Sequence, residues 1–221
     1  MNYTKFLEFD VLDMGDKNWC YEDGTKHYHF GDIENCDGVI DIGACYGGFT
    51  LAASSRTKAD IVAVEPVWDT VVTHNMKKNH ISKCKVVSAA VSDKKEVVSI
   101  EWNGSTRVVE TMIMPEILAL LPSSKKLFVK CDCEGGEWNL LPEHFKNVSR
   151  LEIEFHLLQH GSSTAKAVNP DLVKFLESEY YVFPHTEIMR DANGIARPFS
   201  LWKKSEYPEK KSAAGQGPLK I

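Results

Sequence analysis

Short apolar runs alternate with amphipathic segments from residue 38 onward. The runs end in glycine, proline or acidic residues, which is typical of buried strands. The segments between them carry apolar residues three and four positions apart, which predicts helices. The pattern predicts strands over residues 38–44, 60–66, 85–91, 96–104, 125–132 and 149–156, and helices over 47–57, 67–80, 115–124, 136–145 and 169–180.

Strands that alternate with helices in this way form mostly parallel sheets covered by helices on both faces. The last two apolar runs, 180–185 and 198–204, predict a closing antiparallel hairpin. The sequence therefore predicts an α/β fold. Ligands bind at the carboxyl ends of the strands in such sheets, so the residues that follow each strand are the ones to search for a site.

The flanking regions differ from this regular middle part. Residues 1–37 are rich in turn formers and aromatic residues, and we interpret them as an N-terminal extension and a candidate cap on the substrate side. Residues 205–221 are charged and then rich in small residues, which predicts a disordered tail. The regular region, 38–204, is the predicted domain.

Composition narrows the choice of partners. The chain has 221 residues, which is enough for one domain with a sizeable core. Its formal net charge of −5 makes nucleic acid an alternative partner and not the favoured one. No apolar run approaches the roughly 20 residues that span a bilayer, and the first residues lack the pattern of a secretory signal. We therefore expect a cytoplasmic protein without a membrane partner.

The chain contains six cysteines, Cys20, Cys36, Cys45, Cys84, Cys131 and Cys133. None of them forms the Cys-x-x-Cys pair that is typical of structural zinc sites. In a cytoplasmic protein they are expected to be reduced and to pack as small apolar residues.

The first strand ends in the stretch DIGACYGGFT, which begins at Asp41. A dinucleotide fingerprint has a second glycine that makes room for a pyrophosphate, and here that place holds Cys45. The spacing from Gly43 to Gly47 therefore favours a ligand without a diphosphate. Glu65 ends the next strand, where an acidic residue commonly accepts hydrogen bonds from ribose hydroxyls. The alternative is that Asp41 only caps a turn and that Glu65 is a surface acid.

The stretch LFVKCDCEGGEW, residues 127–138, combines thiols and carboxylates at the end of another strand. In an extended strand Cys131 and Cys133 point to one side, whereas Asp132 and Glu134 point to the other. This alternation argues against a metal cage built from both kinds of side chain, and we expect no metal. Glu137 opens the following helix, where its charge suits the N-terminus.

Glu154 and His156 end the strand predicted over 149–156 with the same facing, because they are two residues apart. They are expected to meet Asp132 or Glu134 above the ligand. A histidine at a strand end near carboxylates is a candidate general base. The alternatives are that His156 is a hydrogen-bonded packing residue, and that Asp132, Glu134 and Glu154 hold a divalent ion.

The order of these motifs resembles the FkbM-like family of class I S-adenosylmethionine-dependent methyltransferases. The similar segments are VIDIGACYGGFTLAAS, IVAVEP, VVSAAVSDKKEVVSIEWN, LFVKCDCEGGEWNLL and LEIEFH, which together cover roughly residues 38–156. The resemblance implies a Rossmann-like fold with a mostly parallel seven-stranded sheet, helices on both faces and a C-terminal antiparallel hairpin. It also implies S-adenosylmethionine as cofactor and O-methylation of a hydroxyl on a small molecule or sugar.

The expected site has a cofactor side and an acceptor side. The cofactor side comprises Asp41, Gly43, Ala44, Gly47, Glu65, Pro66, Ser92 and Asp93, and the catalytic candidates are Asp132, Glu134 and His156. Residues 1–37, the segment from 102 to 114 and the loop 157–170 are expected to line the acceptor pocket. The competing functions are an RNA methyltransferase, a nicotinamide-dependent oxidoreductase, which Cys45 disfavours, and a non-catalytic regulator that binds S-adenosylmethionine.

Overall fold

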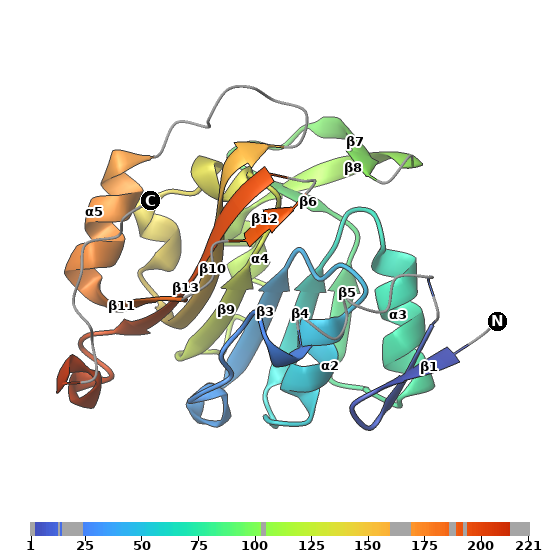
Figure 1. Ribbon diagram of the computed structural model, residues 1–221, viewed down its shortest axis with the longest axis horizontal. Helices are drawn as coiled ribbons and strands as arrows, with labels where there is room; N and C mark the ends of the chain where they lie inside the picture. Colours follow the sequence, from blue (N-terminus) through green and yellow to red (C-terminus); the bar gives the residue numbers. More distant parts are fainter. Residues whose placement is uncertain are drawn as a thin grey trace.

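The computed structural model describes residues 3–12, 14, 24–102, 105–159, 169–185, 189–191 and 194–212. Its centre is a sheet with the strand order β11-β13-β10-β9-β3-β4-β5, and β12 adds to the edge of β13 (Figure 1). The strands are β3 (Gly38–Ile42), β4 (Asp60–Val64), β5 (Cys84–Val87), β9 (Leu127–Cys131), β10 (Val148–Gln159), β11 (Tyr180–Pro184), β12 (Met189–Asp191) and β13 (Gly194–Lys203).

Strands β5, β4, β3, β9 and β10 are parallel to one another, and β13 runs antiparallel between β10 and β11. The mostly parallel seven-strand path and the antiparallel C-terminal strands confirm the predicted fold. Every residue of β3 and β9 is buried. Such strands are covered on both faces, which explains why their sequences are apolar runs and do not alternate with polar residues.

Helices cover both faces of the sheet, as predicted. On one face α4 (Met114–Leu118) and α5 (Pro170–Glu179) pack against Ile40, Val62, Val129 and Ile153. On the other face lie α2 (Gly48–Ser54), which is in front of the sheet in Figure 1, and α3 (Asp69–Lys78). The predicted cap of α5 is confirmed, because Asn169 accepts hydrogen bonds from the backbone of Asp171 and Leu172.

Three predicted elements differ from the structure, two of them because of proline. The helix expected over 115–124 ends at Leu118, before Pro122. The helix expected over 136–145 is divided at Pro142 into two 3-10 helices, η2 (Gly136–Asn139) and η3 (Pro142–Phe145). Proline removes a backbone donor and disfavours a helical conformation in the preceding residue. The strand expected over 85–91 is split into β5 and β6 (Ala90–Ser92), and β6 leaves the main sheet to pair with β8 (Ser105–Ile113).

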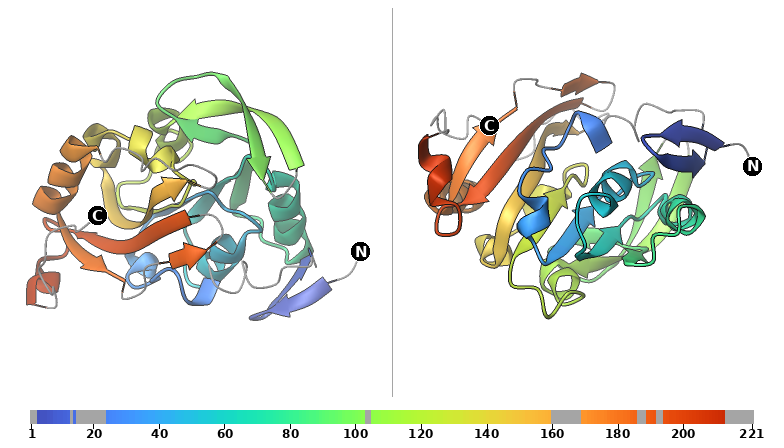
Figure 2. Two further views of the ribbon diagram at one scale, coloured as in Figure 1. Left: turned by 45° about the horizontal axis from the view of Figure 1, so that its top comes forward. Right: turned by 90° about the horizontal axis from the view of Figure 1, so that it is seen from below.

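A hairpin of β7 (Val97–Trp102) and β8 (Ser105–Ile113) projects beyond the carboxyl ends of the parallel strands (Figures 1 and 2). The sequence predicts β7 but not β8. Val97 and Val108 on this hairpin are exposed. The hairpin belongs to one of the segments expected to line the acceptor pocket, and it lies at the edge of the sheet where the parallel strands end (Figure 1). Residues 160–168 of the loop, another such segment, lie outside the described residues.

The described parts of the two flanking regions pack against the domain. At the N-terminus, β1 (Tyr3–Phe6) pairs with β2 (Phe9–Leu12), and the segment before β3 includes η1 (Ile33–Asn35). At the other end η4 (Pro208–Ser212) places Lys210 Nζ 3.0 Å from Asp32 Oδ2. Residues 213–221 of the predicted tail lie outside the described residues, and the domain bounds stay a prediction. No helix in the described ranges is both long and apolar enough to cross a bilayer.

Candidate active site

The carboxyl ends of β3, β4 and β9 are joined by backbone hydrogen bonds. The Gly43 N–H donates to Val64 O over 2.9 Å, and the Asp132 N–H donates to Ile42 O over 3.1 Å. Gly43 has a φ of +73°, and a Cβ there would lie 1.7 Å from Asp132 O. Only glycine fits this position, since any side chain would displace the backbone at Asp132. The predicted cofactor turn and the predicted catalytic strand end are therefore in direct contact.

The turn that follows Gly43 leads into α2. The Gly47 N–H donates to Ala44 O over 2.7 Å, and Gly47 precedes the helix with a φ of +88°. Cys45 also has a left-handed backbone, with a φ of +49°, and its side chain packs against the apolar cluster around α3. A left-handed residue other than glycine costs roughly 1–2 kcal/mol and often marks a functional turn. The idea that Cys45 fills the space of a pyrophosphate stays a prediction.

Glu65 holds this turn against the start of α3. Its Oε2 accepts from the Cys45 N–H over 2.7 Å, and its Oε1 accepts from the N–H groups of Val67 (2.7 Å) and Trp68 (3.0 Å). Burial raises the pKa of Glu65, and these three donors counteract the rise. A carboxylate has roughly four acceptor positions, so about one remains for a ligand. Glu65 therefore links two strand ends, and its role as a ribose acceptor stays a prediction.

A buried row of charges connects the cofactor turn with the acidic strand end. Lys130 Nζ lies 3.4 Å from Asp41 Oδ1 and 3.6 Å from Asp132 Oδ2, and it donates to the carbonyl oxygens of Ile42 and Gly43. Burial raises the pKa of Asp41, whereas Lys130 lowers it. Asp41 lies below the turn and is fully buried, so it supports the turn from beneath. The role of Lys130 was not predicted from the sequence, although a lysine inside the apolar run of β9 is an unusual feature.

The catalytic candidates Asp132, Glu134 and His156 come together at the ends of β9 and β10. The Nε2 atom of His156 lies 3.3 Å from Glu134 Oε2, 3.6 Å from Glu154 Oε1 and 3.7 Å from Asp132 Oδ1. The side chain of His156 is only 8% exposed, whereas that of Glu134 is 40% exposed. Glu134 is therefore the carboxylate of the cluster that faces solvent most. We call Asp132, Glu134, Glu154 and His156 the His156 cluster.

The charges of the cluster oppose the predicted role of His156 as a general base. Burial lowers the pKa of this imidazole, but a hydrogen bond with Glu137 and the charges of Asp132 and Glu134 raise it to about 10. In this arrangement His156 is protonated at neutral pH, and it has to lose a proton before it can accept one. Burial also raises the pKa of Asp132, but Lys130, His156 and a hydrogen bond from Tyr28 lower it below its usual value, so Asp132 is ionised.

Glu137 and Tyr28 orient the cluster, and the sequence analysis missed both roles. Glu137 is fully buried, its Oε1 accepts from the His156 N–H over 2.7 Å, and the same oxygen lies 3.1 Å from His156 Nδ1. It thus opens η2, near the predicted helix start, but it also fixes the imidazole ring. The Tyr28 hydroxyl donates to Asp132 Oδ2 over 2.7 Å. A two-glycine turn directly before a glutamate could have indicated the role of Glu137, whereas nothing local in the sequence indicates the role of Tyr28.

The two thiols of the CDC stretch lie on one side, as the strand alternation predicts. Cys131 Sγ and Cys133 Sγ are 3.9 Å apart, and Cys133 Sγ lies 3.7 Å from Glu137 Oε2. The hydrogen bond with Cys131, together with burial, raises the pKa of Cys133 well above its usual value. A thiol with a raised pKa is a poor nucleophile and a poor metal ligand. Cys131 and Cys133 therefore pack against the apolar core.

The remaining cofactor candidates are Ser92, Asp93 and Pro66. Ser92 ends β6, is buried, and donates to Asp93 Oδ1 over 3.2 Å. Pro66 follows β4 and is partly exposed. The ligand contacts predicted for Ser92, Asp93 and Pro66 therefore stay predictions.

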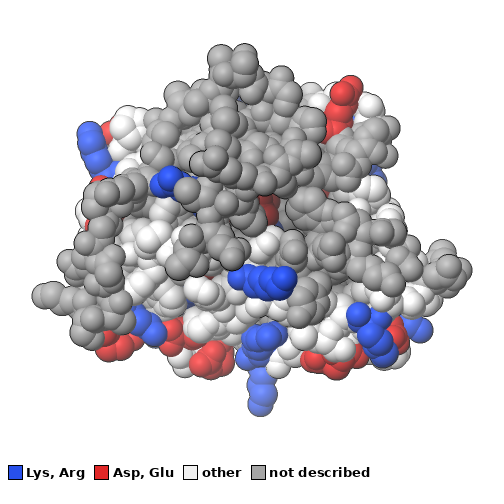
Figure 3. Space-filling model, viewed as in Figure 1, with Lys and Arg blue, Asp and Glu red and all other residues white. Residues whose placement is uncertain are grey.

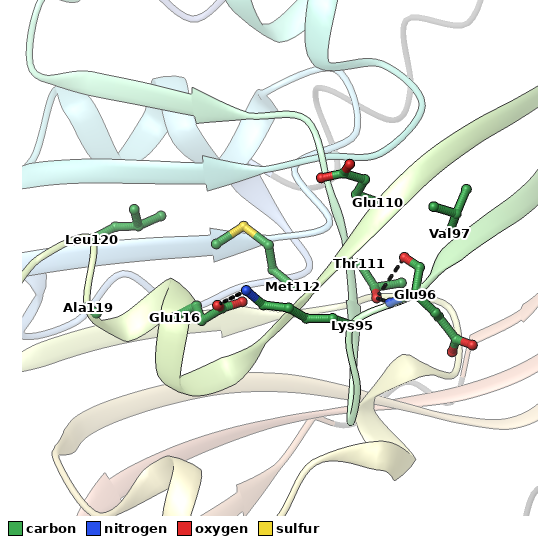
Figure 4. Close-up of a pocket in the computed structure, with 9 residues that line it drawn as sticks. All are labelled: Lys95, Glu96, Val97, Glu110, Thr111, Met112, Glu116, Ala119 and Leu120. Atoms are coloured by element: carbon green, nitrogen blue, oxygen red, sulfur yellow. Dashed lines mark hydrogen bonds and ion pairs between the residues drawn. The ribbon is translucent and has the colours of Figure 1, made fainter.

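A separate hollow of about 630 Å³ lies beside the β7–β8 hairpin (Figure 4). Lys95 reaches across it to an ion pair with Glu116. Glu110, Thr111 and Met112, which line it, belong to the segment 102–114 that was expected at the acceptor pocket. None of the predicted cofactor-binding or catalytic residues lines it, so we place the candidate active site at the strand ends and not in this hollow. The lining residues are Lys95, Glu96, Val97, Glu110, Thr111, Met112, Glu116, Ala119 and Leu120.

Comparison with known proteins supports the fold. No protein-family model and no curated protein sequence matches the chain. The N-terminal domain of EvdMO1, solved with S-adenosylhomocysteine (SAH) and D-fucose, is similar with a TM-score of 0.54 and 11% identity, over 92% of this chain and 90% of that one. WbdD is similar with a TM-score of 0.52 and 12% identity, over 87% of this chain and 44% of that one.

A precorrin-6y C5,15-methyltransferase from Geobacter metallireducens GS-15 has a lower TM-score of 0.49, with 16% identity over 89% of this chain and 94% of that one. The chain has the Rossmann-like methyltransferase fold. The resemblance to the FkbM-like family stays a prediction.

Proposed function

We propose that the protein is an S-adenosylmethionine-dependent methyltransferase of the FkbM-like type that methylates a hydroxyl oxygen on a small molecule or sugar. The observation that carries this proposal is the contact between the glycine turn after β3 and Asp132, which belongs to the His156 cluster. This contact brings a candidate donor site and a candidate acceptor site together. The similarity to the EvdMO1 domain, solved with SAH and D-fucose, supports both the donor and the sugar acceptor.

The donor would lie along the carboxyl ends of β3 and β4. Gly43 and Gly47 allow close approach to the backbone, and Glu65 provides an acceptor for a ribose hydroxyl. Ser92 and Asp93 would line the adenine side. Because Asp41 is buried beneath the turn, its contribution is to hold Gly43 in place through Lys130.

Methyl transfer from a sulfonium needs little covalent chemistry from the protein. The acceptor oxygen forms a bond to the methyl carbon while the carbon–sulfur bond breaks. The electron pair of the broken bond stays on sulfur and gives SAH. The acceptor hydroxyl loses its proton to a carboxylate of the His156 cluster. Alignment of donor and acceptor provides most of the catalysis, and the proton acceptor adds about 10² to 10⁴ in rate. The imidazolium of His156 orients the carboxylates.

The charges visible on the described surface do not favour RNA as the acceptor (Figure 3). On the face shown in Figure 3, Lys and Arg side chains alternate with Asp and Glu side chains along the lower edge. A protein that binds RNA through its backbone needs a basic stripe or patch. Such a stripe is absent from the described residues on this face. The formal net charge of −5 agrees with this interpretation.

A screen of acceptors with S-adenosylmethionine labelled at the methyl group tests the proposal. We expect label to enter monosaccharides, glycosides or small hydroxylated compounds, and the product to be an ether that resists mild alkali. Label that enters only RNA would replace the proposed acceptor. If no compound in the panel accepts label although SAH binds, the chain is the non-catalytic regulator and the proposal is wrong.

A further inference from the structure

We propose that Asp132, Glu134 and His156 bind a divalent transition-metal ion, of which Mn²⁺ is the natural probe. Each of these residues offers one ligand atom, and the three atoms lie within 4.8 Å of one another. Asp132 and Glu134 follow β9, and His156 lies within the adjacent strand β10, whose register with β9 the sheet fixes. The proposed ligand set is two carboxylate oxygens and one imidazole nitrogen, and the ion would displace the proton that Nε2 of His156 carries in the ion-free protein.

The spacing of the ligand atoms suits an ion at their centre. His156 Nε2 is 3.3 Å from Glu134 Oε2 and 3.7 Å from Asp132 Oδ1. Ligands bound at about 2.0–2.2 Å from an ion lie roughly 3.0–3.6 Å from one another, depending on the coordination geometry. The ligand oxygens of Asp132 and Glu134 lie within 4.8 Å of each other, and an ion between them would draw these two carboxylates together. Glu154 Oε1, 3.6 Å from the same nitrogen, is close enough to supply a further oxygen.

In both Asp132 and His156, the side-chain atom that would not bind the ion already contacts a neighbouring residue. Asp132 Oδ2 accepts from the Tyr28 hydroxyl and faces Lys130, which leaves Oδ1 directed toward His156. The Nδ1 atom of His156 faces Glu137 Oε1 at 3.1 Å, which leaves Nε2 directed toward the carboxylates. Protein metal sites commonly use this arrangement, in which a carboxylate holds the other nitrogen of a liganding imidazole.

Charge also favours a cation. Four carboxylates surround the imidazole, those of Asp132, Glu134, Glu137 and Glu154. Lys130 lies beside Asp132 and points toward Asp41 as well, and His27 also acts on Asp132. A divalent ion would add positive charge among these four carboxylates.

A second group of possible ligands in the described part of the chain, His29, Glu152 and His185, lacks these features. Ser200 Oγ lies 3.1 Å from His29 Nδ1 and 2.8 Å from His185 Nε2, and it donates to Glu152 Oε2. Arg150 forms an ion pair with the other oxygen of Glu152. Hydrogen bonds and a resident cation thus already satisfy that group.

The ligand set indicates which ions should bind. Carboxylate oxygens suit Mg²⁺, Ca²⁺ and Mn²⁺, and an imidazole nitrogen shifts the preference toward transition metals. The role of the ion in transfer rests on the proposed function: it would bind the acceptor oxygen and make its hydroxyl more acidic. The binding of the ion itself does not depend on that function.

Titration of the chelator-treated full chain with Mn²⁺, followed by electron paramagnetic resonance, tests the site. We expect one bound ion per chain and a modulation from an imidazole nitrogen in the pulsed spectrum. Glu134→Gln should weaken binding by at least about 10-fold, because it removes one charged ligand. Glu143→Gln is the matched control, since Glu143 is exposed on η3, and it should bind as the parent does. His156→Gln should remove the nitrogen modulation.

Equal Mn²⁺ affinity in Glu134→Gln and the parent would overturn the site, and so would a bound ion without the nitrogen modulation. Because Glu134 is partly exposed, its variant is expected to fold even if the His156 variant does not. Calorimetry with SAH on the same preparations separates the two proposals. If the chain binds SAH but does not bind Mn²⁺, only the metal site is overturned. If it binds Mn²⁺ but does not bind SAH, only the proposed function is overturned.

Discussion

Lys130→Met is expected to lower the free energy of unfolding by about 3–5 kcal/mol, which is the usual cost of removing one partner from a buried ion pair. Lys130 is fully buried between Asp41 and Asp132. Methionine has a similar volume, so the main loss is the charge and the hydrogen bonds to the Ile42 and Gly43 carbonyl oxygens. Urea denaturation of both proteins at neutral pH measures the difference.

Lys126→Met is the matched control, because Lys126 is exposed and immediately precedes β9. It should change the free energy of unfolding by no more than about 0.5 kcal/mol. Addition of Asp41→Asn to Lys130→Met should recover part of the loss, because it removes the buried carboxylate that the first change leaves unpaired. If Lys130→Met and Lys126→Met have equal effects, the buried charge row does not stabilise the fold as described.

Asp132→Asn is expected to slow methyl transfer by about 10² to 10⁴, whereas SAH affinity should stay within about threefold of the parent. The change keeps the size of the side chain but removes the charge that faces His156 and Lys130. The Asp132 backbone, which touches Gly43, is unaffected. Initial rates with an acceptor found in the screen, combined with SAH calorimetry, separate the loss of transfer from a loss of binding.

Asp171→Asn provides the comparison for this experiment. Asp171 is exposed in the first turn of α5, on the face of the sheet opposite to α2, and its substitution should leave the rate unchanged. Full transfer activity in Asp132→Asn would mean that the His156 cluster is not the acceptor side of the site.

The sheet was predictable from the sequence because β3 and β9 are apolar runs with strong end signals. The same reasoning failed at Pro122 and Pro142, where proline outweighed helical spacing and shortened or divided the helices. It also missed β8, whose residues follow β7 in a hairpin that is held by pairing and not by burial on both faces.

The site was predictable where residues follow a strand directly. Asp132 is such a residue, and strand facing correctly brought it together with His156, although β10 continues beyond His156 to Gln159. Lys130, Glu137 and Tyr28 were missed because their roles depend on contacts between distant segments. Tyr28 lies 104 positions before Asp132 in the chain, so only the folded structure shows that its hydroxyl binds that carboxylate.

Calorimetric titration with SAH and with NAD tests the central claim most directly, because it asks which ligand the turn from Gly43 to Gly47 accepts. We expect SAH to bind with one site per chain and NAD not to bind. Glu65→Gln, checked for folding by circular dichroism, should weaken SAH by about 10- to 100-fold, since a hydrogen bond to a charged acceptor contributes about 1.5–3 kcal/mol. Binding of NAD in place of SAH, or unchanged SAH affinity in Glu65→Gln, would contradict the assignment of this turn to a methyl donor.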